Sequence, residues 1–218
     1  MRIASALAGA LFVATSGLSF AEETVEAHGR RAAAPEKPEW EFVATAYGNA
    51  PRNSDDFASG IAAADRGPLH LEFRANYEAI HAQSGFIGWT FSGEAGGVKL
   101  EATPIIGGVT GSIGGPIAGV EASVAMGKFD FYIEAEYVRG RGTKEESYTY
   151  AWSELGYTPM EKLRLGIVAQ RTRLYGGDRD VQRGGFIQAT WGRALFGVYW
   201  FNPGSSDQVV IGSLGLSF

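Results

Sequence analysis

The sequence predicts an all-β fold: a transmembrane, antiparallel, up-and-down β-barrel of twelve strands, with ten as the alternative. Three observations favour this class. Apolar and polar residues alternate over most of the chain from Trp40 onward. After the first residues, no segment approaches the roughly 20 apolar residues that a spanning helix needs. The chain has 31 Gly, 13 Phe, 9 Tyr and 5 Trp but only 20% charged residues, a composition typical of strands with one apolar and one wet face.

The N-terminal residues predict an export signal rather than part of the fold. Met1-Arg2 forms a short positive start, residues 3–18 are apolar or small, and Ser19-Phe20-Ala21 is a small-x-small cleavage site. We therefore expect a signal peptide at 1–21. Residues 22–38 are rich in Ala, Glu and Pro without a period, which predicts a mobile periplasmic tail; a small plug or partner-binding peptide is the alternative. The chain has no Cys and hence no disulfide.

Residues 39–218 form the predicted barrel, whose strands are separated by clusters of Gly, Pro, Asn, Asp or Ser. An even number of strands leaves both termini on the periplasmic side. The segment 56–64 has little aromatic or β-branched content and has helical propensity, but without it the count is odd. The expected strands are 39–47, 56–64, 69–79, 86–92, 98–108, 117–126, 129–138, 147–157, 163–174, 185–191, 194–201 and 208–218.

The connections between these strands differ at the two ends of the barrel. With the N-terminus in the periplasm, the predicted periplasmic turns are 65–68, 93–97, 127–128, 158–162 and 192–193. The predicted external loops are longer, at 48–55, 80–85, 109–116, 139–146, 175–184 and 202–207. Short periplasmic turns and longer external loops are typical of outer-membrane barrels.

The last strand carries a resemblance to a known class. Val210, Leu214, Leu216 and Phe218 share one face, and the chain stops on its aromatic residue. This pattern resembles the closing strand of bacterial outer-membrane β-barrels, whose last residues are read by the assembly machinery. The resemblance implies an outer-membrane location after export and contacts with outer-membrane lipid and lipopolysaccharide. It also implies recognition of Phe218 by the barrel-assembly machinery.

Strand faces predict which side chains meet lipid. Leu69, Leu71 and Phe73 alternate with charged or polar neighbours, and the same alternation recurs in 129–138 and 163–174. Soluble sandwiches also alternate, but the repetition of large apolar faces favours lipid. Aromatic residues near strand ends predict interfacial girdles; they are Trp40, Tyr77, Trp89, Phe91, Phe129, Tyr137, Tyr157, Trp191, Trp200 and Phe218.

The opposite faces predict a lumen with more acids than bases. Either these charges pair across strands and close the interior, or water fills it and the acids favour cations. Twelve strands lie between the filled eight-stranded and the aqueous sixteen-stranded barrels. The predicted selectivity residues are Glu72, Arg74, Lys99, Glu101, Glu121, Glu134, Glu154 and Arg164; Glu41, Glu78, Asp130, Glu136 and His70 share these faces.

Arg171 and Arg173 continue the outward parity of strand 163–174 at its external end. Outward Arg is nearly neutral at a membrane interface, so contact with lipopolysaccharide phosphates is one interpretation. A bulge that turns both side chains inward is the other.

No catalytic residue, metal site or cofactor is predicted. Twelve strands also resemble the outer-membrane phospholipases, but His81 and Ser84 in a short turn are the only testable base and nucleophile. His70-x-Glu72 alone does not make a metal site.

The expected function is a porin-like passive channel for small polar or cationic solutes. The alternative is a closed structural or adhesive barrel that acts through its loops, and a lipid-modifying enzyme is third. Known twelve-stranded channels for acidic oligosaccharides have a basic pore lining, from which this acid-rich lumen departs. A net charge of −5 argues against nucleic acid, and a homo-oligomer is possible.

Overall fold

The computed structural model describes residues 38–142, 147–174 and 179–218, and every regular element in these ranges is a β-strand. The predicted signal peptide and all of the predicted tail except Pro38 lie outside the described residues. Within the described ranges, no helix is long and apolar enough to cross a membrane.

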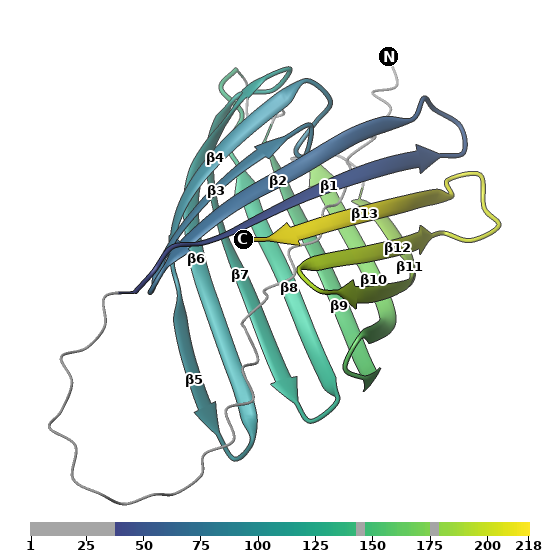
Figure 1. The fold of residues 1–218 in the computed structure, drawn as a ribbon. Helices are drawn as coiled ribbons and strands as arrows, with labels where there is room; N and C mark the ends of the chain where they lie inside the picture. The colour runs from purple at the N-terminus through teal and green to yellow at the C-terminus, as the bar shows by residue number, and fades with distance from the viewer. Residues whose placement is uncertain (1–37, 143–146, 175–178) are drawn as a thin grey trace, which may run out of the picture.

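The strands form one closed antiparallel barrel (Figure 1). The strands are β1 (Glu41–Pro51), β2 (Phe57–Arg66), β3 (Leu69–Ala75), β4 (Ala82–Trp89), β5 (Phe91–Ala95), β6 (Val98–Gly111), β7 (Gly115–Met126), β8 (Phe129–Val138), β9 (Tyr148–Met160), β10 (Leu163–Leu174), β11 (Arg179–Trp191), β12 (Ala194–Phe201) and β13 (Val209–Ser217). Each strand pairs with its neighbours in the sequence, except that β4 pairs with β6 and not with β5. The sheet closes where β1 pairs with β13.

Two of these segments, β4 and β5, are halves of one barrel strand. Gly88 pairs with Ile105 of β6 and Phe91 pairs with Ala102, so the register is the same on both sides of the break. In this register Trp89 lies opposite Pro104, which has no N–H to donate to the ladder. The barrel therefore has twelve strands among the described residues, as predicted, and the ten-stranded alternative is wrong.

The two ends of the barrel differ as the sequence predicts. At one end, called here the turn end, five two-residue turns join the strands, at 67–68, 96–97, 127–128, 161–162 and 192–193. Gly67, Gly96, Gly127 and Gly192 begin four of these turns with φ between +58° and +61°, a conformation that Gly adopts without strain. Connections at the other end, the loop end, are longer, for example 76–81 and 202–208.

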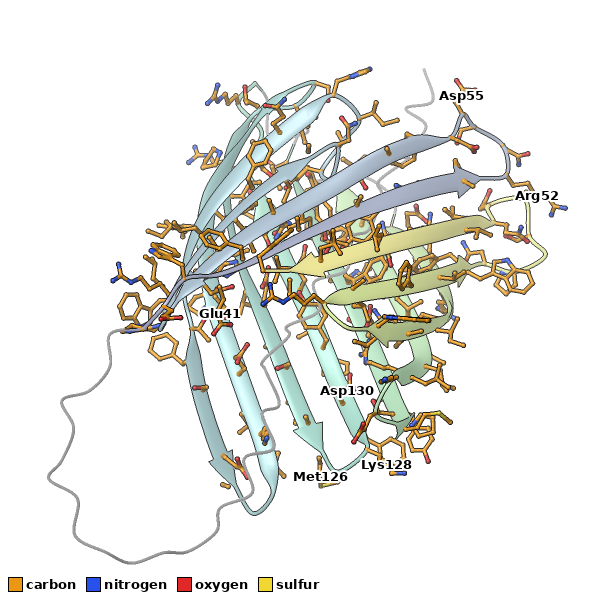
Figure 2. The ribbon with its side chains drawn as sticks, viewed as in Figure 1. Glu41, Arg52, Asp55, Met126, Lys128 and Asp130 are labelled. Atoms are coloured by element: carbon orange, nitrogen blue, oxygen red, sulfur yellow. The ribbon has the colours of Figure 1, made fainter. Side chains whose placement is uncertain are left out.

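Side chains alternate between the two faces of the barrel wall, as the sticks in Figure 2 illustrate. β4 alternates buried and exposed residues without a break. Leu71, Phe73, Ile167, Leu214 and other apolar side chains of the predicted lipid face are exposed on the outside. The aromatic residues predicted for the girdles are also exposed outside, with one exception, Tyr77.

The predicted strand 69–79 is wrong beyond Ala75. Asn76 has a φ of +54° and its side chain bonds backbone groups, donating to the Ala58 carbonyl and accepting from the His81 N–H. The chain therefore leaves the ladder at Asn76. As a result Tyr77, expected at the membrane interface, is only 2% exposed and lies inside the barrel.

Candidate functional site: the barrel interior

The interior centres on Arg74, an inward residue of β3 that is fully buried. Its guanidinium contacts five carboxylates from three strands and one loop. Nη1 donates to Glu134 Oε1 at 3.1 Å and to Glu136 Oε1 at 2.8 Å, both from β8. The other three partners are Glu72 on β3, Glu78 in the loop 76–81 at 3.7 Å and Glu121 on β7 at 3.4 Å. We call these six residues the Arg74 cluster.

Aromatic rings cover the guanidinium of Arg74. Its Cζ lies 4.5 Å from the ring centroid of Tyr77 and 4.4 Å from that of Phe86, within the range of cation–π attraction. The Tyr77 hydroxyl donates to Glu134 at 2.7 Å. The inward turn at Asn76 thus places Tyr77 and Glu78 against residues of β3 and β8.

Glu78 shows that burial disfavours the ionised form of a carboxyl. Burial raises the pKa of its carboxyl above the ordinary value, although the Arg74 charge and the hydrogen bond from Ser84 act in the opposite direction. The Ser84 hydroxyl donates to Glu78 Oε1 at 2.5 Å.

A second charged group surrounds Arg164 near the turn end. Its guanidinium donates to both carboxylate oxygens of Asp130, to Glu154 Oε2 at 2.6 Å and to Gln188 Oε1 at 2.8 Å. The side chains of Arg164 and Asp130 are 19% and 26% exposed. Water therefore reaches this group from the turn end, whereas it does not reach Arg74.

Aromatic side chains pack together in the interior beside the Arg164 group, where the Arg164 Cζ lies 4.6 Å from the ring centroid of Phe186. The Trp152 ring lies edge-on to Tyr199 and Phe201, with ring centroids 5.5 and 5.3 Å apart, and Phe186 stacks on Tyr199 at 5.4 Å. Trp152 Nε1 also donates to Glu154. All four rings are at most 6% exposed. Together with the Arg74 cluster, they close the barrel to water beyond the Arg164 group in the described part of the chain.

Two of the predicted selectivity residues lie outside the closed part of the interior. Lys99 faces inward but is exposed at the turn end of β6, and no ion pair among the described residues includes it. Glu101 is half-buried, and its carboxyl interacts electrostatically with Asp65 and His70. The predicted pairing of charges across strands therefore does not include Lys99, because β6 extends beyond the level at which the acids gather.

The only predicted base and nucleophile are not brought together. His81 is exposed in the loop 76–81, whereas Ser84 is buried in the interior and bonded to Glu78. One side chain is exposed and the other buried with a different partner, so the arrangement does not favour base-assisted attack by Ser84.

Structural comparison places this architecture among known proteins. The KdgM porin superposes with a TM-score of 0.57 at 9% sequence identity, over 81% of this chain and 98% of that chain. KdgM in complex with disordered oligogalacturonate gives the same TM-score at 8% identity, over the same shares of the two chains. The chain has the fold of a small outer-membrane porin.

A more distant structural match and the sequence comparisons add little information about the protein. A BenF-like porin from Pseudomonas fluorescens Pf-5 superposes with a TM-score of 0.45 at 11% identity, over 78% of this chain and 58% of that one. No protein-family model matches the sequence, and no curated protein is significantly similar to it.

The porin-like barrel also settles where Arg171 and Arg173 point. β10 and β11 pair without a register shift, with Arg171 opposite Val181 and Arg173 opposite Arg179. The bulge interpretation is therefore wrong, and both side chains are exposed outside. Arg179 and Arg183 of β11 share this outer face, so four arginines gather at the loop end of two strands. Sequence reasoning missed the last two because the predicted strand began only at residue 185.

Proposed function

We propose that this chain is a porin-like protein of the bacterial outer membrane that passes small polar or cationic solutes. Passage requires that Arg74 leave the carboxylates around it, because the interior is closed in the conformation described above. The observation that carries the proposal is the excess of acid in the closure: five carboxylates contact one guanidinium.

The acid excess sets the expected charge preference. A passage lined by carboxylates attracts cations and repels anions, most strongly where the walls have a low dielectric constant. Glu121 and Glu134 lie opposite each other on β7 and β8, so displacement of Arg74 leaves their charges facing a common space. An acidic solute such as the oligogalacturonate bound by KdgM is disfavoured here for the same reason.

The test is ion current through the refolded mature protein in a planar bilayer. We expect intermittent current with a reversal potential that shows cation preference in a salt gradient. Changing Glu72, Glu101 and Glu121 together to Gln should remove the preference, whereas Lys99→Gln, on the exposed end of β6, should not. Anion-preferring current, or unchanged preference in the triple variant, would contradict the proposal.

A second candidate is a permanently closed structural barrel that acts through its loops. The packing of Trp152, Tyr199 and Phe201 favours it, because these rings cannot move as easily as one arginine side chain. Folded protein that carries no current at any voltage would support this candidate in place of the first.

Contacts with the envelope complete the proposal. The four outward arginines at the loop end are placed to meet lipopolysaccharide phosphates, since Arg binds phosphate in a bidentate manner. Phe218 is exposed, and its N–H donates to the Phe42 carbonyl at 2.9 Å. Its ring is therefore accessible beside β1 for recognition by the barrel-assembly machinery.

A further inference from the structure

Three potential metal ligands converge on the inner wall of the barrel beside Arg74. His70 and Glu72 are inward residues of β3, and Glu121 comes from β7. One ligand atom from each lies within 4.8 Å of the others, and all three residues are buried. The sequence spacing reveals only the first two, since Glu121 joins them through the curvature of the sheet.

His70 is held in the orientation of a metal ligand. Its Nδ1 lies 2.7 Å from Asp65 Oδ1, on the neighbouring strand β2. Metal-binding histidines commonly bond a carboxylate through one ring nitrogen, which fixes the ring and directs the other nitrogen at the metal. Here the other nitrogen, Nε2, lies 3.9 Å from Glu72 Oε2. That separation is too long for a hydrogen bond, and a small inward movement of the two side chains would let both atoms bind one ion.

Glu72 supplies an oxygen atom directed into the same space. Its Oε1 contacts Arg74, whereas its Oε2 is buried and makes no hydrogen bond. A buried carboxylate oxygen without a partner is costly. The surrounding charge adds to the cost, because the Arg74 cluster holds five carboxylates and one guanidinium.

We propose that His70, Glu72 and Glu121 bind a divalent transition-metal ion, with Asp65 positioning the histidine. One imidazole and two carboxylates are donors that suit Zn²⁺, whereas Mg²⁺ and Ca²⁺ prefer oxygen ligands alone. Two positive charges offset part of the acid excess. The ion links β3 to β7 across the interior, and the proposal holds whether or not the barrel conducts.

Solvent has a route to the site. The Asp65 side chain is 35% exposed, and β2 ends one residue later at the turn 67–68. The ion therefore enters from the turn end.

The test is zinc binding by the refolded mature barrel after removal of metal by a chelator. Dialysis against ZnCl₂ followed by elemental analysis should find one zinc per chain in the wild type and in the control His81→Asn, which removes an exposed histidine. His70→Gln and Glu121→Gln should bind zinc at least about 10-fold more weakly. Asp65→Asn, which changes a partly exposed side chain, should weaken binding by about 10–100-fold.

The proposal is overturned if the folded wild type takes up no stoichiometric zinc. It is also overturned if His70→Gln or Asp65→Asn binds zinc as tightly as His81→Asn does. Either result would mean that His70, Glu72 and Glu121 do not form a metal site. Heat-modifiable gel migration identifies the folded variants, and Asp65→Asn keeps the test decisive if the buried substitutions do not fold.

Discussion

At the level of single residues, the two interior arginines differ in their access to water. Arg74 is fully buried and contacts five carboxylates, whereas the Arg164 side chain is 19% exposed and its partner Asp130 26%. Charges that water does not reach are the more expensive to leave unpaired. The Arg74 cluster is therefore the more sensitive of the two groups.

Replacing Arg74 with Met should lower the free energy of unfolding by about 3–5 kcal/mol, because buried carboxylates lose their counter-charge. Arg164→Met should cost less, since water can hydrate Asp130. Urea titration of the protein folded into lipid vesicles measures both variants. Equal stability of Arg74→Met and wild type would show that the guanidinium is not needed to hold the acids in place.

The stability of the barrel should also depend on the protonation of Glu78. Its pKa in the folded state is raised by burial, so the folded protein binds this proton more tightly than the unfolded chain does. The contribution of Glu78 therefore favours folding at low pH and declines as the pH rises from the ordinary glutamate value through the raised one.

Glu78→Gln removes this titration and should flatten the decline in unfolding temperature between acidic and neutral pH. Heat-modifiable gel migration at a series of pH values follows it. A slope identical to that of the wild type would assign the pH dependence to other groups.

At the level of strands, the sequence predicts the bounds well where a tight turn lies directly beside a strand. β8, β10 and β12 have the predicted bounds, because a two-residue turn immediately precedes each of them, at 127–128, 161–162 and 192–193. β4 begins four residues before its prediction, since Gln83 and Ser84 are both polar and Gly85 carries no side chain that reveals a face. The end of β3 was missed because Asn76 adopts a positive φ that no periodicity indicates.

Close strand packing predicts that β10 is intolerant of a side chain at Gly166. A Cβ there would lie 2.0 Å from the Leu155 carbonyl oxygen and 2.9 Å from the Phe186 ring. Gly166→Ala should therefore destabilise the barrel by about 1–3 kcal/mol. Gly212→Ala on β13 is the matched control, because nothing lies within 4 Å of its Cβ position. Similar unfolding curves for the two variants would contradict this packing.

The outer face of β10 and β11 predicts an anion contact. Arg173 and Arg179 lie opposite each other, and like charges in that position repel unless an anion separates them. Changing Arg171 and Arg173 to Glu should weaken retention of lipopolysaccharide on the purified protein, whereas Arg193→Glu at the turn end should not. Equal retention by all three proteins would remove lipopolysaccharide as a partner of this surface.

At the level of the whole molecule, the question that the sequence left open was whether the interior is filled. Inward parity identified Glu72, Arg74, Glu121 and Glu134 correctly, but parity does not say which side chains meet across a barrel. Their convergence depends on strand curvature and on Tyr77, which the predicted strand placed outside. The closed interior is thus a property of the assembled barrel, and it cannot be predicted from the strand count or the composition.

The most direct measurement of this closure uses the absence of cysteine from the chain. Three variants each carry one cysteine, in place of Ser84, Thr103 or Ser206. Ser84 and Thr103 are buried inside the barrel, whereas Ser206 is solvent-exposed in the loop 202–208. Each variant is treated with a small charged thiol reagent. If Arg74 and the aromatic rings close the barrel, the interior cysteines should react at least about 100-fold more slowly than the loop cysteine, because reaction requires local opening. Rates within a few-fold of the loop cysteine would contradict the account and indicate a lumen open to water.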